Sequence, residues 1–150
     1  MSAPFTPPLF RSRNAVASPP IGATRAEASR MIFLKAARLM AIGGVNDAGA
    51  AALMLGWFGR TYRRPLVLMR ALMLELSRVS QRRIQLAPPC SGRLTRDEAT
   101  MLRAMGREEW QIDRSHDDAC ELLATDNALG AAICFQAVSA CFADLGSPLR

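Results

Sequence analysis

Residues 63–76 of the chain read RRPLVLMRALMLEL, and this stretch decides the fold. It is too apolar for a surface helix. It is also too short and too charged to cross a membrane, because a span needs about 20 mostly apolar residues, and Arg70 and Glu75 interrupt this one. A helix that is apolar on nearly every side is buried by other helices. The stretch therefore predicts an all-α, single-domain bundle of five or six helices.

Start and stop signals divide the rest of the chain into helices. Thr24 and Thr95 each open a capping box, with a glutamate three residues later, and such a box satisfies two backbone amides at a helix N-terminus. The expected helices cover 24–43, 47–58, 65–85 and 95–106, a short fifth helix capped by residues 115–118, and 128–145. The third and the sixth are the most apolar, so we expect them at the centre of the bundle.

The N-terminal residues 1–23 differ in composition from the rest. They are rich in Pro, Ser and Ala and show no hydrophobic periodicity, which is typical of a disordered tail. The sequence therefore predicts a tail over 1–23 and a helical domain over 24–150. The tail lacks the apolar core of a secretion signal, and none of the four cysteines forms a C-x-x-C pair. A cytoplasmic protein with reduced thiols is the expectation.

Net charge is unevenly distributed along the chain. The total is +6, and eighteen of the nineteen basic residues are arginine, a bias that fits a GC-rich genome. Residues 1–56 carry +4, residues 57–96 carry +8 and residues 97–150 carry −6. A basic middle and an acidic C-terminal third can neutralise each other within the fold or between protomers. This asymmetry favours a protein-interaction or self-associating module at least as much as a nucleic-acid partner.

The junction at residues 57–64 interleaves aromatic residues with arginines. Aromatic stacking combined with phosphate contacts is one way to hold a single strand, and anionic lipid is a weaker alternative. The remaining interpretation is that the aromatic residues pack a corner between helices. The candidate interaction residues are Trp57, Arg60, Tyr62, Arg63, Arg64, Arg78, Arg82 and Arg83. A helix-turn-helix is disfavoured, because a recognition helix needs a polar face that residues 65–76 lack.

Chemistry-bearing residues are sparse. Cys90 lies in a Pro-rich loop close to Arg93, and because positive charge favours the thiolate form, it is the candidate reactive thiol. His116, Cys120, Cys134 and Cys141 lack the close ligand pairs of a zinc site. We therefore expect Cys134 and Cys141 to pack in the core rather than bind a metal, and His116 to be an exposed residue of a capping turn. No catalytic motif and no cofactor motif is present, and the sequence predicts neither an enzyme nor a cofactor.

Several stretches of the chain resemble a family of small, uncharacterised bacterial proteins. They are the segment from Tyr62 to Ser80, the Ala87-Pro88 loop with Cys90, and the terminal Phe142-Ala143-Asp144-Leu145-Gly146. The resemblance covers roughly residues 35–149 and implies no activity. It does imply that the N-terminal tail lies outside the shared unit.

The functional expectation is a non-catalytic cytoplasmic module that binds a protein partner or a second copy of itself. A nucleic-acid-binding regulator that uses the arginines of 57–96 is the alternative. A membrane partner is not expected.

Overall fold

The two predicted capping boxes start two of the helices. Glu27 N donates a hydrogen bond to Thr24 Oγ1 at 3.2 Å, and Thr24 N donates one to Glu27 Oε2 at 2.6 Å. Thr95 and Glu98 repeat the exchange at 3.1 and 2.9 Å. Each box satisfies two amides that have no partner inside the helix. Helices α1 (Arg25–Gly43) and α4 (Arg96–Met105) therefore begin where the sequence predicts.

The computed structural model describes residues 22–150, except for the side chain of Glu109. Within this part the chain forms six α-helices and two short 3₁₀ turns, and no strand. Besides α1 and α4, the elements are α2 (Ala48–Phe58), η1 (Gly59–Thr61), α3 (Arg63–Val79), η2 (Glu109–Gln111), α5 (Ile112–Leu123) and α6 (Leu129–Asp144). The predicted all-α bundle is confirmed. The tail predicted over 1–23 lies almost entirely outside the described residues.

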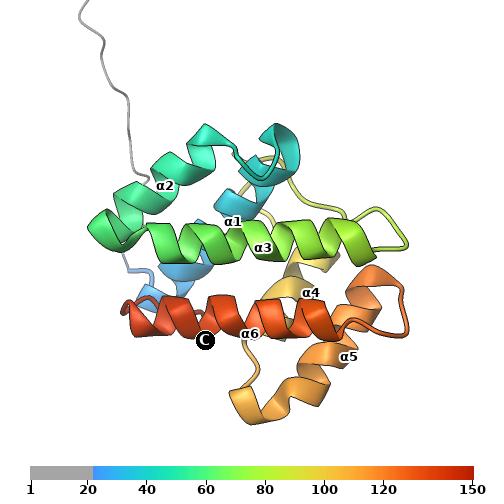
Figure 1. Ribbon diagram of the computed structural model, residues 1–150. Helices are drawn as coiled ribbons and strands as arrows, with labels where there is room; N and C mark the ends of the chain where they lie inside the picture. The colour runs from blue at the N-terminus through green and yellow to red at the C-terminus, as the bar shows by residue number, and fades with distance from the viewer. Residues whose placement is uncertain (1–21) are drawn as a thin grey trace, which may run out of the picture.

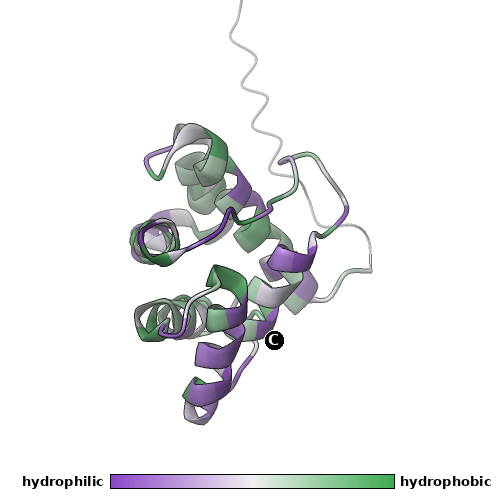
Figure 2. Ribbon diagram, turned by 90° about the vertical axis from the view of Figure 1, so that its right-hand side faces the viewer, coloured by the Kyte–Doolittle hydropathy of each residue, from purple (hydrophilic) through white to green (hydrophobic). Residues whose placement is uncertain are grey.

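Helices α3 and α6 lie side by side and antiparallel at the front of the molecule (Figure 1). Arg64 meets Asp144 at one end of the pair, and Glu75 lies against Gly130 near the other end. Helices α1 and α4 lie behind this pair, and α2 and α5 close the two sides (Figures 1 and 2). Figure 2 shows α3 and α6 end-on, as one layer at the left of the picture. This is the side that faces the viewer in Figure 1, and no described helix covers it.

The core lies between this front layer and the helices behind it. Large apolar side chains of α3 and α6 point back into it and meet those of α1 and α4. Its largest fully buried members include Phe33, Leu34, Met69, Leu72, Met101, Met105, Leu122, Phe135 and Phe142. Leucine, methionine and phenylalanine side chains fill most of the interior. The third and sixth helices contribute much of this core, but they form its front layer and do not lie at the centre of the bundle as predicted.

The expectation that helix 65–85 is wrapped on every side is wrong. Val67 and Leu74 on α3 are 59% and 55% exposed, and Ile133 on α6 is 55% exposed. Arg70, in the middle of residues 63–76, is partly buried, and its Nε donates a hydrogen bond to the carbonyl of Val45 at 3.0 Å. The stretch has two apolar faces. One face is buried in the core, and the other is exposed to solvent.

Helix α3 also ends earlier than predicted, at Val79 instead of Gln85. Ser80 adopts an extended conformation, and its hydroxyl bonds to the backbone of Arg82. Gln81 N donates to the carbonyl of Leu123 at 2.9 Å. These contacts draw the chain out of the helix, so Arg82 and Arg83 lie in the following loop and not in the last helical turn.

The start of α5 is a second correction. The helix begins at Ile112, and residues 115–118, the predicted cap, lie inside it. Ser115 is buried, and its hydroxyl donates to the carbonyl of Ala104 at 3.1 Å instead of capping an amide. At α6 the predicted break holds, because Leu129 N donates to Asn127 Oδ1 at 3.2 Å.

Leu72 and Leu74 on α3 allow a matched test of the two faces. Leu72 is fully buried, whereas Leu74 is 55% exposed. Leu72→Ala should lower the free energy of unfolding by about 2–5 kcal/mol, because it leaves a cavity. Leu74→Ala should change it by about 0.5 kcal/mol or less. Urea unfolding followed by circular dichroism gives both values, and equal losses would contradict the assignment of the faces.

Candidate interaction surface

The aromatic residues of the 57–64 junction pack a corner between helices. Phe58 meets Phe142 edge to face, with ring centroids 4.9 Å apart. Trp57 Nε1 donates to Ser147 Oγ at 3.0 Å, and the guanidinium of Arg25 lies 4.4 Å from the centre of its ring. Tyr62 is half-buried against the core. The three rings are therefore partly buried by contacts within the protein, which reduces the surface on which a nucleic-acid base could stack.

The arginines at this corner are exposed. Arg64 Nη1 lies 3.2 Å from Asp144 Oδ2, with both side chains more than half exposed. Arg60 and Arg63 make no ion pair with any carboxylate in the described part of the chain. An exposed pair such as Arg64 with Asp144 contributes at most about 1 kcal/mol. The corner therefore carries a modest positive charge.

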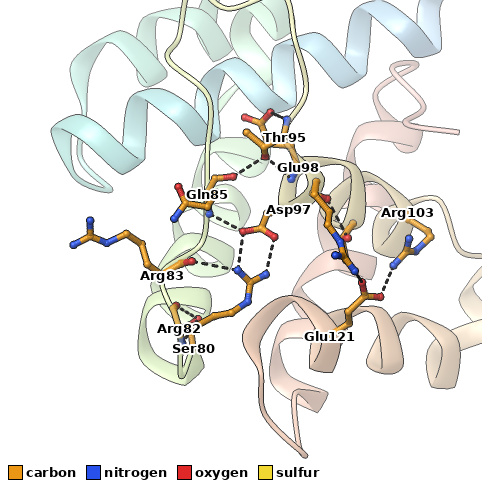
Figure 3. A network of polar contacts seen from close by, with 11 residues as sticks. Ser80, Arg82, Arg83, Gln85, Thr95, Asp97, Glu98, Arg103 and Glu121 are labelled. Atoms are coloured by element: carbon orange, nitrogen blue, oxygen red, sulfur yellow. Dashed lines mark hydrogen bonds and ion pairs between the residues drawn. The ribbon is translucent and has the colours of Figure 1, made fainter.

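The other predicted arginines lie at the opposite end of α3. Arg78 forms two hydrogen bonds with Glu75, at 2.9 and 3.0 Å. Arg82 binds both oxygens of Asp97, at 2.6 and 3.0 Å, as Figure 3 shows. Arg83 is exposed. Two of these three guanidinium groups are thus engaged by carboxylates.

The candidate arginines do not form one groove. Arg63 and Arg78 are separated along α3 by about 22 Å at 1.5 Å per residue, and the stretch between them is mostly apolar. The acids of the C-terminal third are paired partly from within that third and partly by arginines of the preceding segments. Asp118 binds Arg103 and Arg107 at 2.7 and 2.9 Å. Glu121 also binds Arg103, at 2.7 Å (Figure 3).

Cys90 is exposed in the loop after α3, beside a hollow of about 760 Å³ on the outer side of α1. Met31, Leu94 and Trp57 are among the residues that line this hollow. Its walls are mostly apolar, and Glu27, Lys35 and Ser91 are among the polar residues that line it. None of the hydrogen bonds within the described residues joins one of them to the Cys90 thiol. The geometry gives Cys90 access to solvent but no neighbouring base.

Cys120, Cys134, Cys141 and His116 are partly or fully buried. The expectation that His116 is exposed in a capping turn is wrong, because it lies inside α5. His116 Nε2 accepts a hydrogen bond from Ala128 N at 3.2 Å and lies 3.5 Å from Cys120 Sγ. Burial raises the pKa of the Cys134 and Cys141 thiols, which favours the neutral form. Within residues 22–150, no three His, Cys, Asp or Glu side chains are grouped so as to hold a metal ion.

The sequence analysis missed a buried ion pair between α1 and α4. Arg38 and Glu98 are 2% and 0% exposed and share two hydrogen bonds, at 2.7 and 2.9 Å. Arg38 also donates to the carbonyls of Ser91 and Arg93 at 2.7 and 3.0 Å. The sequence shows Arg38 among the apolar residues of helix 24–43 and Glu98 in the capping box of Thr95. Neither position indicates that the two side chains pair with each other.

The carboxylates beside the loop after α3 stay ionised because of their partners. Hydrogen bonds from Arg82 hold the pKa of Asp97 below its ordinary value, against the opposing effect of burial. For Glu98, burial alone would raise the pKa, but hydrogen bonds from Arg38, Thr95 N and Ala87 N together lower it. Asp97 also accepts from Gln85 N at 2.7 Å. Two acids of α4 thus fix the path of residues 82–95.

A second missed feature is an apolar surface on the front layer, which we call the α3–α6 face. It consists of Val67, Ala71 and Leu74 on α3 and of Ile133, Ala137 and Ala140 on α6. On each helix these residues are three or four positions apart and so share one side. Val67, Ala137 and Ala140 line one shallow depression together with Arg63, Arg64 and Leu68, so the two helices share one surface at this end.

The α3–α6 face contains no charged residue, and charges stand only at its ends. Arg63, Arg64 and Asp144 lie at one end, and Glu75 and Arg78 lie towards the other. Side chains at the same spacing line the buried seam of a helix bundle. The signal was present in residues 63–76, but a pattern that is apolar on every side does not say which face is left uncovered.

The chain matches the model of DUF6628, a family of unknown function, over residues 14–142. It belongs to this family. No curated protein and no solved structure matches the chain. The resemblance to an uncharacterised family is thus confirmed, but the match begins at residue 14 instead of about residue 35. Part of the predicted tail therefore lies within the region that DUF6628 proteins share.

The family assignment brings no activity with it, so the function of this DUF6628 chain has to be argued from its own surface. Among residues 22–150, no helix combines the length and the apolar composition that crossing a bilayer requires.

Removing Arg38 tests the buried pair. Arg38→Met keeps most of the apolar stem but leaves the Glu98 carboxylate buried without its main partner. The free energy of unfolding should fall by about 3–5 kcal/mol, as when one member of a buried pair is lost. Arg83→Met is the control, because Arg83 is exposed, and it should change the stability by about 0.5 kcal/mol or less. Similar losses for both variants in urea unfolding would contradict a structural role for Arg38.

Stability should also depend on pH through Asp97 and Glu98. Their pKa values lie below the ordinary 3.8 and 4.5, so the unfolded chain binds more protons as acid is added. Their contribution is complete above about pH 4.5 and is lost progressively below it. Asp97→Asn should be less stable than the wild type at neutral pH and should lose less as the pH falls. Urea unfolding over a pH series measures this, and parallel pH profiles for the two proteins would refute the assignment.

Proposed function

We propose that this chain is a non-catalytic protein-interaction module of the bacterial cytoplasm, which binds through the α3–α6 face. The proposal rests on one observation. Val67 and Leu74 on α3 and Ile133 on α6 are apolar and more than half exposed, and the two helices are adjacent. Soluble monomers rarely expose large contiguous apolar patches, and such patches usually mark interaction sites.

The pattern of charge supports a protein partner over a nucleic acid. Arginines of the basic middle segment pair with acids of the C-terminal third: Arg64 with Asp144, Arg82 with Asp97, and Arg96 with Glu121. Nucleic acid needs a stripe of available cations that follows the phosphate backbone. Here the exposed arginines are divided between the two ends of α3, and the apolar stretch lies between them.

The nucleic-acid alternative rests on Arg60 and Arg63, which are exposed at the corner beside Tyr62. Binding to a generic oligonucleotide at physiological salt should be no tighter than about 10⁻⁴–10⁻⁶ M, the range of non-specific contact. Fluorescence anisotropy across about 50–200 mM salt measures it. Nanomolar binding that weakens steeply with salt and is lost in Arg60→Glu with Arg63→Glu would favour the alternative.

Affinity capture with matched variants tests the proposal. Ile133→Arg puts a charge on the α3–α6 face, whereas Ile42→Arg makes the same change at an exposed position of α1, where Ile42 is 74% accessible. Protein partners captured by the wild-type chain should be retained by Ile42→Arg, lost by Ile133→Arg and unaffected by nuclease. Capture that survives Ile133→Arg, or that disappears with nuclease, would overturn the proposal. Circular dichroism confirms that both variants are folded.

A further inference from the structure

We infer that a hollow between α1, the end of α4 and the C-terminal residues binds a small ligand that carries a dianionic phosphate group. The hollow measures about 430 Å³, and Arg30, Arg103, Arg107 and Arg150 line it, so we call it the arginine hollow. None of the described side chains that line it is acidic. No described residue of α3 or α6 lines it either, so this site is separate from the α3–α6 face.

Contacts with the C-terminal residues hold the arginines around the hollow. Arg30 on α1 donates through Nε to the carbonyl of Leu149 at 2.8 Å. Arg150 donates through Nη1 to the carbonyl of Arg107 at 3.4 Å and to Glu108 Oε2 at 2.7 Å. Leu149 and Arg150 therefore connect α1 with the segment after α4. The cluster is assembled by the fold, because its members come from distant parts of the sequence.

The carboxylates near the arginine hollow engage only part of its charge. Asp118 binds two arginines, through Arg103 Nε at 2.7 Å and Arg107 Nε at 2.9 Å. Glu121 also binds Arg103, as Figure 3 shows. Arg30 makes no ion pair with a carboxylate in the described part of the chain. Arg30 and Arg107 thus leave positive charge at the hollow, and like charges that lie close together are unfavourable until an anion binds.

Arg30 and Arg107 also have hydrogen-bond donors that no described group uses. A guanidinium carries five N–H donors. In both residues Nε is engaged, whereas no described group accepts a hydrogen bond from Nη1 or Nη2. Both side chains are partly buried, which limits the positions that they can take. Two guanidinium groups whose outer nitrogens line one hollow can bind the oxygens of one anion in pairs.

The number of charges and donors favours a phosphate over a carboxylate. A phosphate monoester carries a charge of about −1.5 to −2 at neutral pH and has three acceptor oxygens, whereas a carboxylate carries one charge and two oxygens. Leu102 and Leu149 line the hollow beside the arginines. Its volume lies within the roughly 300–1,000 Å³ of small-molecule sites. We therefore expect a phosphate ester with a small apolar group.

A nuclear magnetic resonance titration of the ¹⁵N-labelled full-length chain with phenyl phosphate, at constant ionic strength, tests the inference. At up to about 10 mM ligand it detects a dissociation constant of about 1 mM. Amide shift changes should saturate and should centre on residues 106–111 and 149–150. Benzoate has the same ring but one negative charge, and it should bind at least about tenfold more weakly. No saturable change at these residues, or equal affinity for benzoate, would overturn the inference.

Matched variants locate the site. Arg30→Gln and Arg107→Gln should each weaken the binding of phenyl phosphate by about tenfold or more, because each removes hydrogen bonds to a charged group. Arg83→Gln removes the same charge from an exposed position in the loop after α3 and should leave the affinity unchanged. Circular dichroism confirms that the variants are folded.

Arg30→Gln decides the matter if Arg107→Gln fails to fold because Asp118 loses one of its two partners. The hydrogen bond to the carbonyl of Leu149 is the only side-chain contact of this kind that Arg30 makes within the described residues. Unchanged affinity in Arg30→Gln, or equal weakening in Arg83→Gln, would overturn the inference.

Vesicles distinguish a soluble phosphate ester from a lipid head group with the same phosphate. The chain is sedimented with phosphatidylcholine vesicles that contain or lack phosphatidic acid. We expect no retention by either, because the hollow has the size of a small-molecule site. Retention by phosphatidic acid that phenyl phosphate displaces and Arg30→Gln abolishes would keep the site and assign its phosphate to a lipid head group.

Discussion

The buried pair of Arg38 and Glu98 is the constraint on which the rest of the structure depends. It joins α1 to α4, and the same guanidinium binds the carbonyls of Ser91 and Arg93 in the loop between α3 and α4. Glu98 in turn receives the amide of Ala87 at 3.0 Å. A loop with two consecutive prolines has few hydrogen bonds of its own. Arg38 and Glu98 therefore help to set the path of this loop. Burying the two charges costs the desolvation free energy that any buried ion pair carries.

This constraint explains why the front face of α3 and α6 stays exposed to solvent. With α1 and α4 joined behind the front layer, they cover the back of α3 and α6, and the chain has placed α2 and α5 at the sides (Figures 1 and 2). No described helix remains to cover the front. Val67, Leu74 and Ile133 are consequently exposed, although their spacing is that of a buried seam.

Local signals in the sequence predicted most helix boundaries. The capping boxes at Thr24 and Thr95 act within four residues, and the glycines after α1 and α2 adopt positive φ values of 87° and 58°. Long-range contacts decided the rest. α3 stops at Val79 because Gln81 and Arg82 bind Leu123 and Asp97 on other elements, while Ser80 bonds locally to the backbone of Arg82. The exposed face could not be foreseen either, because hydrophobicity identifies an apolar side but not whether another helix covers it.

The central claim, that the α3–α6 face is the surface of association, is tested most directly by nuclear magnetic resonance. Amide spectra of the ¹⁵N-labelled chain would be compared before and after addition of a protein partner captured by the wild-type chain. The account predicts shift changes at residues 67, 71, 74, 133, 137 and 140, while the corner at Trp57 and the loop at Cys90 stay unchanged. Changes centred on the corner or the loop would contradict it.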